Sequence, residues 1–244
     1  MTKGGSMTNQ KINEIIKDVV TIKKELIGIK AWKEVPEGIP KYEGKAFPGM
    51  CGQIGEVLTS GETFVTNLSN QLCTGGVVAT GVARPPSPKA SINIAKMHLE
   101  LMKDYGNLDT ALCYEDEMKK LIPHCKEKNA AVQLGRFREM KEADLVLIFC
   151  TPGIADLINR AYSYVTGKPI QGFGGNGGCP FVIQYPYVTK KPSFTYSDIS
   201  WRKFVGLTDD ELTMCFPFQS LVEFIETFPS VAENYRKFGE GMKL

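Results

Sequence analysis

Residues 167–185 read Gly-Lys-Pro-Ile-Gln-Gly-Phe-Gly-Gly-Asn-Gly-Gly-Cys-Pro-Phe-Val-Ile-Gln-Tyr. Five glycines fall between Gln171 and Cys179, and a hydrophobic run follows at once. Glycine permits a positive φ and a close approach of the backbone to another group, at a cost of about 0.5–1 kcal/mol per residue in regular structure. Two interpretations stay open: a backbone wrapped around a small ligand, and a flexible turn followed by a buried cysteine.

Hydrophobic periodicity on both sides of this loop predicts alternating helices and strands. Helices are expected at 9–26, 48–58, 90–104, 114–121, 154–166, 221–228 and 231–238. Strands are expected at 27–35, 62–68, 130–135, 144–150 and 181–185. A further helix is expected to begin at Thr208, because Glu211 follows three residues later as in a capping box. We therefore expect an α/β (α+β) fold: a single domain over 9–244, with a mixed sheet flanked by helices, after a disordered leader of residues 1–8.

The composition is that of a globular chain without a strong charge. Of the 244 residues, 43% are hydrophobic and 23% are charged, and the formal net charge is +2. The sequence has no long basic run, which argues against a nucleic-acid surface because such surfaces neutralise phosphates. No run of about 18 apolar residues occurs, so no membrane span is expected. The N-terminal residues lack the apolar core of a signal peptide, and we expect a cytoplasmic location.

The seven cysteines are dispersed through the chain, and no Cys-x-x-Cys pair occurs. Local clusters of the rubredoxin, zinc-ribbon and ferredoxin types are therefore excluded. The two histidines, His98 and His124, are too few for a histidine-rich zinc or di-iron site. Any metal site would have to be assembled from cysteines that lie far apart in the sequence.

The chain contains a weak internal repeat that ends in two of these cysteines. Gly61 precedes Cys73 by 12 residues, and Gly167 precedes Cys179 by the same spacing. An amphipathic helix is expected before each glycine, and an apolar run follows each cysteine. We expect two pseudo-symmetric halves that bring the two cysteines to a shared site. These halves span about 28–125 and 130–228.

Three thiols from separate segments, those of Cys51, Cys73 and Cys179, suit an iron–sulfur cluster, zinc or copper(I), because thiolate binds these centres strongly. Backbone N–H groups of glycine-rich loops can donate to cluster sulfides and tune the potential. The glycines expected to do so are Gly75, Gly76, Gly174, Gly175, Gly177 and Gly178. A three-cysteine cluster leaves one iron open to a substrate or to another ligand. The alternative is that these cysteines only fill the core, where free cysteine is common.

Two other kinds of site have weaker support in the sequence. A cysteine nucleophile needs a base beside a low-pKa thiolate, and His98 is expected to be a surface or satisfied core histidine. The loop contains Gly172-Phe-Gly174-Gly-Asn-Gly177, which fits the dinucleotide pattern Gly-x-Gly-x-x-Gly. That pattern requires a helix after the loop, whereas a strand is expected here, and no Walker-type Gly-Lys-Ser/Thr occurs. A nucleotide site is therefore disfavoured.

Several other residues are expected to be structural. Cys150 ends an apolar strand and is expected in the core. Cys113 and Cys125 lie in a polar region and are expected to have no part in a site. Residues 198–202 and 209–211 could supply an ion pair or a substrate clamp. Of these two, a structural ion pair or a cation–π contact is expected for Arg202. The role of Cys215 stays undecided.

A set of motifs spread along the chain carries a family resemblance. They are Cys51 with Gly55, Cys73-Thr-Gly-Gly76, Ala143-Asp-Leu-Val-Leu-Ile-Phe149 before Pro152, the glycine loop that ends in Cys179, and Trp201-Arg202 with Asp209-Asp-Glu-Leu212. In these motifs the chain, from about residue 20 to 228, resembles the uncharacterised ArCR family (domain of unknown function 169), found in archaea and anaerobic bacteria. The family brings no settled activity. The resemblance implies an anaerobic, cytoplasmic context, which favours an oxygen-sensitive centre.

We therefore expect a redox or electron-transfer protein with an iron–sulfur cluster, or a related thiolate-bound metal centre, held by Cys51, Cys73 and Cys179. The alternative is a non-catalytic module that binds a small molecule or cofactor at the glycine loop. The expected partner is accordingly a redox partner or a small molecule. A homo-oligomer is compatible with the sequence, because the C-terminal helices carry four aromatic residues that could equally lie in the core. These are Phe224, Phe228, Tyr235 and Phe238.

Overall fold

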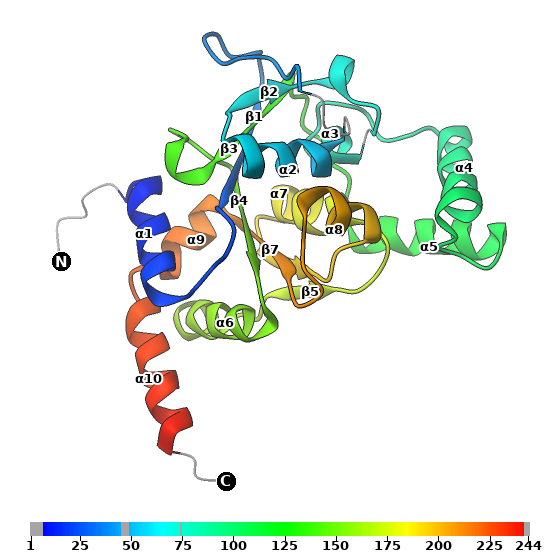
Figure 1. The fold of residues 1–244 in the computed structure, drawn as a ribbon. Coiled ribbons are helices and arrows are strands. Elements are labelled where there is room, and N and C mark those ends of the chain that lie inside the picture. Colours follow the sequence, from blue (N-terminus) through cyan, green and yellow to red (C-terminus); the bar gives the residue numbers. More distant parts are fainter. Residues whose placement is uncertain (1–6, 45–48, 74, 242–244) are drawn as a thin grey trace.

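The computed structural model describes residues 7–44, 49–73 and 75–241, and of residues 101–102 and 239–241 the backbone alone. In this part of the chain a seven-stranded sheet has the order β2-β3-β1-β4-β7-β6-β5 (Figure 1). Its strands are β1 Ile27–Trp32, β2 Phe64–Thr66, β3 Ala131–Arg136, β4 Leu145–Cys150, β5 Gln171–Phe173, β6 Ser193–Thr195 and β7 Leu212–Pro217. Strands β5 and β6 are parallel, and the other neighbouring pairs are antiparallel, so the sheet is mixed.

Helices surround this sheet, which confirms the expected mixed α/β fold. In the described residues they are α1 Asn9–Val19, α2 Met50–Ser60, α3 Gly75–Ala79, α4 Pro88–Met97, α5 Leu108–Leu121, α6 Pro152–Thr166, α7 Tyr185–Thr189, α8 Ile199–Val205, α9 Phe218–Ile225 and α10 Phe228–Gly241. A π-helical segment, His98–Met102, follows α4, and another, Pro180–Gln184, precedes α7. Short 3₁₀ turns span Leu68–Asn70 and Phe137–Glu139. Within the described residues, no helix combines the length and the apolar character needed to cross a bilayer.

The central strand β4 shows why the sheet is covered on both sides. All six of its residues are buried. Alternate side chains enter two hydrophobic clusters, one on each face: Leu145, Leu147 and Phe149 in the first, and Val146, Ile148 and Cys150 in the second. Successive side chains of a strand point to opposite faces, so a strand buried on both faces must be apolar throughout.

The two faces of the sheet carry different helices. The second cluster contains residues of α1, α6, α9 and α10. The first contains residues of α2, α8 and the helical segment that ends in α7. Figure 1 shows α2 and α8 packed side by side on this face. The helices that carry Cys51 and Cys179 therefore share one face of the sheet.

Helices α4 and α5 form an arm that projects from the body of the molecule (Figure 1). The two helices pack on each other. Helix α4 buries Ser91 and Ala95, and α5 buries Ala111. This arm, residues 88–121, is therefore a peripheral element, and Met118 of α5 packs against the first cluster.

The apolar run after the glycine loop is helical, and the strand predicted at 181–185 is wrong. Helical backbone begins at Gly178 and continues through the π-helical segment and α7 to Thr189. Residues 181–183 are all buried. The run therefore has no polar face whose spacing would distinguish a helix from a strand.

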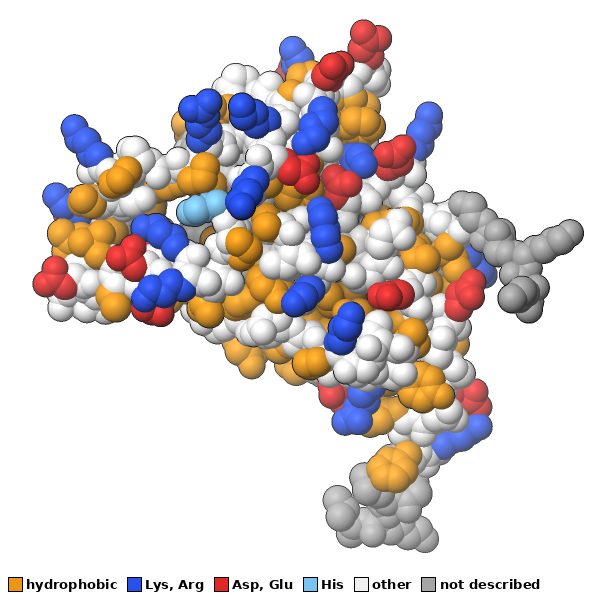
Figure 2. Space-filling model, turned by 180° about the vertical axis from the view of Figure 1, so that it is seen from behind, with side chains coloured by type: hydrophobic (Ala, Val, Ile, Leu, Met, Phe, Trp, Pro, Cys, Tyr) orange, Lys and Arg blue, Asp and Glu red, His pale blue; other side chains and the backbone are white. Residues whose placement is uncertain are grey.

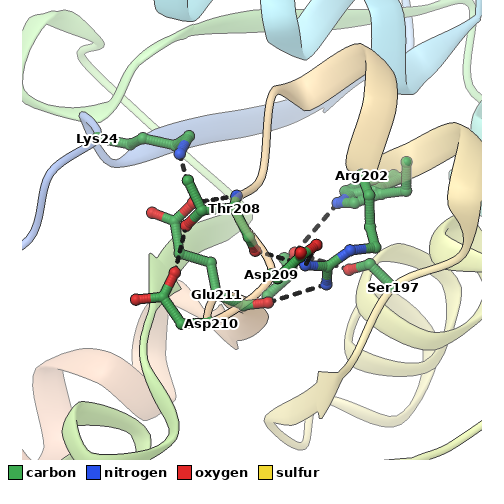
Figure 3. Close-up of polar contacts among 9 residues, drawn as sticks. Lys24, Ser197, Arg202, Thr208, Asp209, Asp210 and Glu211 are labelled. Atoms are coloured by element: carbon green, nitrogen blue, oxygen red, sulfur yellow. Dashed lines mark hydrogen bonds and ion pairs between the residues drawn. The ribbon is translucent and has the colours of Figure 1, made fainter.

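The helix predicted to begin at Thr208 is also wrong, although the contact that suggested it does form. The Thr208 N–H donates to Glu211 Oε2 at 2.9 Å, but the segment closes a turn, and β7 begins at Leu212. The same carboxylate accepts from Lys24 Nζ at 2.5 Å (Figure 3). The apolar residues that follow are buried in the sheet, and this burial outweighs the local capping signal.

Two pseudo-symmetric halves are not confirmed. Gly61 and Gly167 both end a helix in the left-handed conformation, with φ of 78° and 67°, and both helices lead to a three-residue edge strand. However, β2 pairs antiparallel with β3, whereas β5 pairs parallel with β6. Helices α2 and α6 also cover opposite faces of the sheet.

Most of the expected disordered leader, residues 1–6, lies outside the described residues. Met7 packs against the core, and the Thr8 hydroxyl accepts a hydrogen bond from the Lys11 N–H at 3.2 Å at the start of α1. Met7 and Thr8 therefore belong to the folded part of the chain. Helix α1 ends at Val19, earlier than the periodicity predicted.

Candidate thiol site

Cys51 and Cys179 each lie in the first turn of a helix on the same face of the sheet. Cys51 is the second residue of α2 and is buried, with 7% of its surface exposed. Cys179 follows Gly178 at the start of the helical segment that ends with α7, and it is half-buried. Cys73 lies two residues before α3 and is exposed. Backbone N–H groups in the first turn of a long helix carry a partial positive charge, which favours a thiolate there.

Gly75 shows how close Cys73 and Cys179 are. A Cβ atom at Gly75 would lie 3.8 Å from Cys73 Sγ and 3.9 Å from Cys179 Sγ. Both sulfur atoms therefore lie within 3.9 Å of one point, and their separation cannot exceed twice that distance. The structure thus brings together the two cysteines that the sequence repeat paired, even though the repeat is not confirmed as a symmetry of the fold.

Cys51 is electrostatically coupled to both of the other thiols. The pKa of Cys51 is raised to about 12, first by burial and then by the nearby charges of Cys73 and Asp198. Burial likewise raises the pKa of Cys179, and the charges of Cys73, Cys51 and Asp198 add to this effect. Each thiol therefore lies within Coulombic range of the other two. Without a cation nearby, Cys51 and Cys179 are expected to be protonated at neutral pH.

The three thiols are gathered without being set at ligand distances. Among the residues that the structure describes, no three His, Cys, Asp or Glu side chains are arranged to hold a metal ion. Cys73 is exposed while Cys51 is buried, so the two side chains differ in depth. The role of the three cysteines as metal ligands stays a prediction.

Asp198 connects two of the helices around the thiols. Its Oδ1 accepts the Trp201 N–H at 2.7 Å and so caps α8, while its Oδ2 accepts the Gly178 N–H at 2.6 Å. The sequence did not place Asp198 at the thiol site. An aspartate three residues before Trp201 signals a helix N-cap. That signal does not reveal Gly178 as the second partner, because the two residues are 20 positions apart.

Two of the predicted ligand-binding glycines have packing roles. Gly76 lies against Met50, and any side chain there would clash with it. A Cβ atom at Gly178 would lie 2.5 Å from the ring of Trp201. The Gly178 N–H is bound to Asp198, so it is not available to a cluster. Donation to a cluster stays a prediction for Gly75, Gly76, Gly174, Gly175 and Gly177.

The glycine loop has the strand–loop–helix order of a dinucleotide fingerprint, contrary to expectation. Strand β5 precedes it, the helical segment from Gly178 follows, and β6 returns parallel to β5. The strand predicted after the loop is absent, so the order of elements does not disfavour a nucleotide here. A phosphate is disfavoured for another reason. The Asp198 carboxylate occupies the helix N-terminus where a phosphate would bind, and it would repel one.

The α4–α5 arm contacts the glycine loop through Tyr114. Its hydroxyl donates to the carbonyl of Asn176 at 3.3 Å and lies against Gly175, which has a φ of 147°. The ring of Tyr105 stands 5.3 Å from that of Tyr114, between centroids. Burial raises the pKa of Tyr114, and the charge of Asp198 adds to the effect. The arm therefore borders the site.

The other cysteines have separate environments. Cys150 and Cys215 are buried in β4 and β7, with 3% and 0% of their surfaces exposed, and burial raises the pKa of both. The core position expected for Cys150 is confirmed, and Cys215 is a core residue as well. Cys113 is exposed on α5, and Cys125 is half-buried in the loop after it.

Two polar residues singled out in the sequence have structural partners. The Nδ1 atom of His98 lies 2.8 Å from Asp104 Oδ2, so His98 is a satisfied histidine. Arg202 forms an ion pair with Asp209 at 3.7 Å (Figure 3). It also donates to three backbone carbonyl groups, those of Tyr196, Thr208 and Glu211. The structural role expected for Arg202 is confirmed.

An open pocket of about 740 Å³ includes none of the three cysteines in its lining. Two of its lysines are neutralised by carboxylates: Lys33 pairs with Glu127 at 2.6 Å, and Lys30 pairs with Asp144 at 3.0 Å. On the face seen from behind, Figure 2 shows Lys and Arg side chains interspersed with Asp and Glu. The pocket lining combines three lysines with five carboxylates, so it has no excess of positive charge to attract an anion.

Comparison with known proteins identifies the family. Residues 15–227 match the uncharacterised ArCR family, domain of unknown function 169. The chain belongs to this family. An uncharacterized protein of Methanocaldococcus jannaschii is 25% identical to this ArCR protein over 242 residues. The match covers 93% of the present chain and 97% of that relative. No solved structure matches the chain. The resemblance drawn from the cysteine and glycine motifs is thus confirmed.

Proposed function

We propose that this ArCR protein holds an iron–sulfur cluster, or a related thiolate-bound metal centre, at Cys51, Cys73 and Cys179, and that it serves in redox chemistry or electron transfer. The observation that carries the proposal is the convergence of these three thiols from separate segments on one face of the sheet. Thiolate is the ligand that iron–sulfur clusters, zinc and copper(I) prefer.

The electrostatics of the site favour a bound cation. As thiolates the three cysteines would repel one another, and burial would add to that penalty. A metal removes both penalties, because its charge deprotonates coordinating thiols outright. The backbone N–H groups of Cys51 and Gly52 act in the same direction, since their hydrogen bonds lower the pKa of Cys51. The site therefore favours thiolates when a metal supplies the positive charge.

Metal binding requires the exposed Cys73 side chain to turn towards the buried Cys51. Cys179, which is half-buried, lies at an intermediate depth. A centre with three thiolate ligands keeps a further position for solvent, a substrate or another ligand. Because Cys73 is exposed, that position would be reached from the surface of the molecule.

The proposed chemistry has a consequence for location. A metal–thiolate centre needs reduced cysteines, so we place the protein in a reducing compartment such as the cytoplasm.

The C-terminal helices bear on a homo-oligomer. Of the aromatic residues considered for one, Phe224 and Phe228 lie in the core. Tyr235 and Phe238 on α10 are 40% and 65% exposed. A second copy would therefore use the distal part of α10.

A second candidate is a non-catalytic module that binds a small molecule at the glycine loop. It is favoured by the parallel β5–loop–helix–β6 unit, because α/β proteins bind ligands at the carboxyl ends of such strands. Asp198 at the helix N-terminus would select a neutral or cationic ligand. Thermal-shift screening of the metal-free protein tests this candidate. Stabilisation that persists after Cys51, Cys73 and Cys179 are all replaced by serine would favour it over a metal centre.

Anaerobic purification, followed by incubation with iron and sulfide, tests the metal proposal. Metal analysis and visible absorption are expected to show bound metal in the wild-type protein. Single replacement of Cys51, Cys73 or Cys179 by serine should deplete it. Cys150→Ser is the control for a buried thiol and Cys113→Ser the control for an exposed one, and both should retain the metal.

Three results would count against the metal proposal. Absence of iron, zinc and copper from the wild-type protein, both as purified and after incubation, would overturn it. Equal depletion in the Cys113→Ser variant would show that the metal is held by other thiols. Retention of metal in the Cys51→Ser, Cys73→Ser and Cys179→Ser variants would have the same meaning.

A further inference from the structure

Both oxygens of the Asp198 carboxylate are engaged by backbone N–H groups from different parts of the chain. The Trp201 N–H donates to Oδ1 at 2.7 Å within α8. The Gly178 N–H donates to Oδ2 at 2.6 Å, and Gly178 directly precedes Cys179. A helix N-cap needs only the first of these bonds. The second bond ties the start of the Cys179 helix to the start of α8.

Helix α8 in turn packs on the helix that carries Cys51. Gly55 lies one turn after Cys51 in α2, and the carbonyl group of Phe204 in α8 lies directly against it, so that any side chain there would clash. Figure 1 shows α2 and α8 side by side. Through Asp198 and α8, the position of Cys179 is therefore fixed relative to the helix of Cys51.

The backbone next to Asp198 is held in an unfavourable conformation. Ser197 has a φ of 69°, in the left-handed region that residues other than glycine seldom adopt. Its N–H donates to Thr195 Oγ1 at 3.2 Å, and its hydroxyl lies 3.0 Å from Thr213 Oγ1. Thr213 Oγ1 also accepts the Nε1–H of Trp201 at 3.1 Å. Such strain persists only where the surrounding structure over-determines it, and such places cluster at functional sites.

We propose that Asp198 is the positioning residue of the thiol site. It holds the first turn of the Cys179 helix on α8, and it thereby sets where the Cys179 thiol stands relative to Cys51 and Cys73. The ring of Trp201 packs against Gly178, which is a second contact between α8 and the start of the Cys179 helix. The consequence of this role for metal binding rests on the function proposed above, whereas its consequence for the spacing of the thiols does not.

Asp198→Asn separates this bridge from ordinary helix capping. Asparagine caps helices about as well as aspartate. Its amide has one oxygen, however, so it cannot accept from both Trp201 and Gly178 in the way that the carboxylate does.

A cross-linking assay measures the spacing of the thiols. The metal-free, reduced protein is treated with dibromobimane, which links two thiols that lie a few ångströms apart. Mass spectrometry then measures the cross-link between Cys73 and Cys179.

The wild-type protein is expected to form this cross-link. The Cys179→Ser variant lacks one of the two thiols and so sets the background yield. Asp198→Asn should give a yield near this background. Asp198→Ser keeps one capping oxygen and lacks the second acceptor, so it should behave like Asp198→Asn. Asp209→Asn, a change at an exposed aspartate, should keep the wild-type yield. Circular dichroism identifies the variants that are folded, and only those are compared.

A wild-type yield in a folded Asp198→Asn or Asp198→Ser variant overturns the inference, and so does absence of the cross-link in the wild-type protein. Metal analysis of the same variants separates this inference from the function proposed above. Loss of the cross-link in Asp198→Asn while the wild-type protein binds no metal would support the positioning role and overturn the metal centre. Metal in the wild-type protein, with an unchanged cross-link in Asp198→Asn, would support the metal centre and overturn the positioning role.

Discussion

The carbonyl oxygen of Phe204 occupies the space that a side chain at Gly55 would need. Helices α2 and α8 reach this separation because Gly55 has no Cβ atom. The substitution Gly55→Ala should stabilise α2 by about 1 kcal/mol, because alanine has a higher helix propensity than glycine. The forced separation of the helices costs about 1–3 kcal/mol. The new methyl group meets backbone, which cannot rotate away, so the cost should fall in the upper part of that range. We therefore expect a net loss of about 1–2 kcal/mol in the free energy of unfolding, measured by urea titration.

Gly153→Ala is the matched control for this substitution. Gly153 lies in the first turn of α6, and a Cβ atom there would meet no other atom within 4 Å. The free energy of unfolding should stay the same or rise by at most about 1 kcal/mol. Equal destabilisation by the two alanines would show that the contact with Phe204 is not the cause.

Glu211 should make the stability of the protein depend on pH in the acid range. Burial alone would raise the pKa of Glu211, but hydrogen bonds from Lys24 and from the Thr208 N–H lower it below its ordinary value of 4.5. A carboxyl group with a depressed folded pKa stabilises the protein above its unfolded pKa, and this contribution is lost as the pH falls through the folded pKa. Glu211→Gln should therefore lose about 1.5–3 kcal/mol at neutral pH.

Thermal unfolding of the wild-type protein and of Glu211→Gln, from neutral pH down to about pH 3, tests this prediction. The difference in stability should be constant near neutral pH and should shrink below the ordinary pKa of the carboxyl group. A difference that stays constant over the whole range would contradict a role for the ionised Glu211.

The thiols should differ strongly in their rates of alkylation. The pKa of Cys51 is raised from 9.0 to about 12. This shift lowers the thiolate fraction about a thousandfold in mildly alkaline solution. Cys73 and Cys113 are exposed and should react with iodoacetamide first, whereas the buried Cys51, Cys150 and Cys215 should react last. Timed alkylation of the metal-free protein, read by mass spectrometry, gives the order. Reaction of Cys51 at the rate of Cys73 would contradict the described burial.

Tyr114→Phe should loosen the α4–α5 arm. The substitution removes the hydrogen bond from the hydroxyl to the carbonyl of Asn176 and should cost about 0.5–1.5 kcal/mol. Hydrogen exchange should become faster in residues 88–121, while α1 should keep its wild-type rates. Tyr164→Phe, at a tyrosine that is 75% exposed, is the control. Faster exchange in that variant too would show that the contact with Asn176 is not responsible.

The fold could be predicted best where one periodicity extends over a whole element. The six-residue apolar run of β4 predicted a strand buried on both faces, and the structure has one. The apolar run at 181–183 was assigned to a strand because, in so short a segment, burial on all sides removes the pattern that distinguishes a helix. The capping signature of Thr208 and Glu211 formed its hydrogen bond in a turn, because that bond is local and specifies nothing about the residues that follow.

The candidate site could be predicted in part. The equal spacing of Gly61 to Cys73 and of Gly167 to Cys179 indicated that the two cysteines belong together, and the structure places them beside Gly75. Asp198 was missed, since its bond to Gly178 depends on how two helices pack and not on any neighbouring residue.

The two edges of the sheet, β2 and β5, contain three residues each. An edge strand exposes unpaired N–H and carbonyl groups that can template another chain, and a short strand offers few of them. At β2 the chain already covers its own edge: the Val65 N–H donates to the Pro40 carbonyl, and the Tyr42 N–H donates to the Val65 carbonyl, both at 2.8 Å. Growth into fibrils by strand addition is therefore opposed at both ends of the sheet.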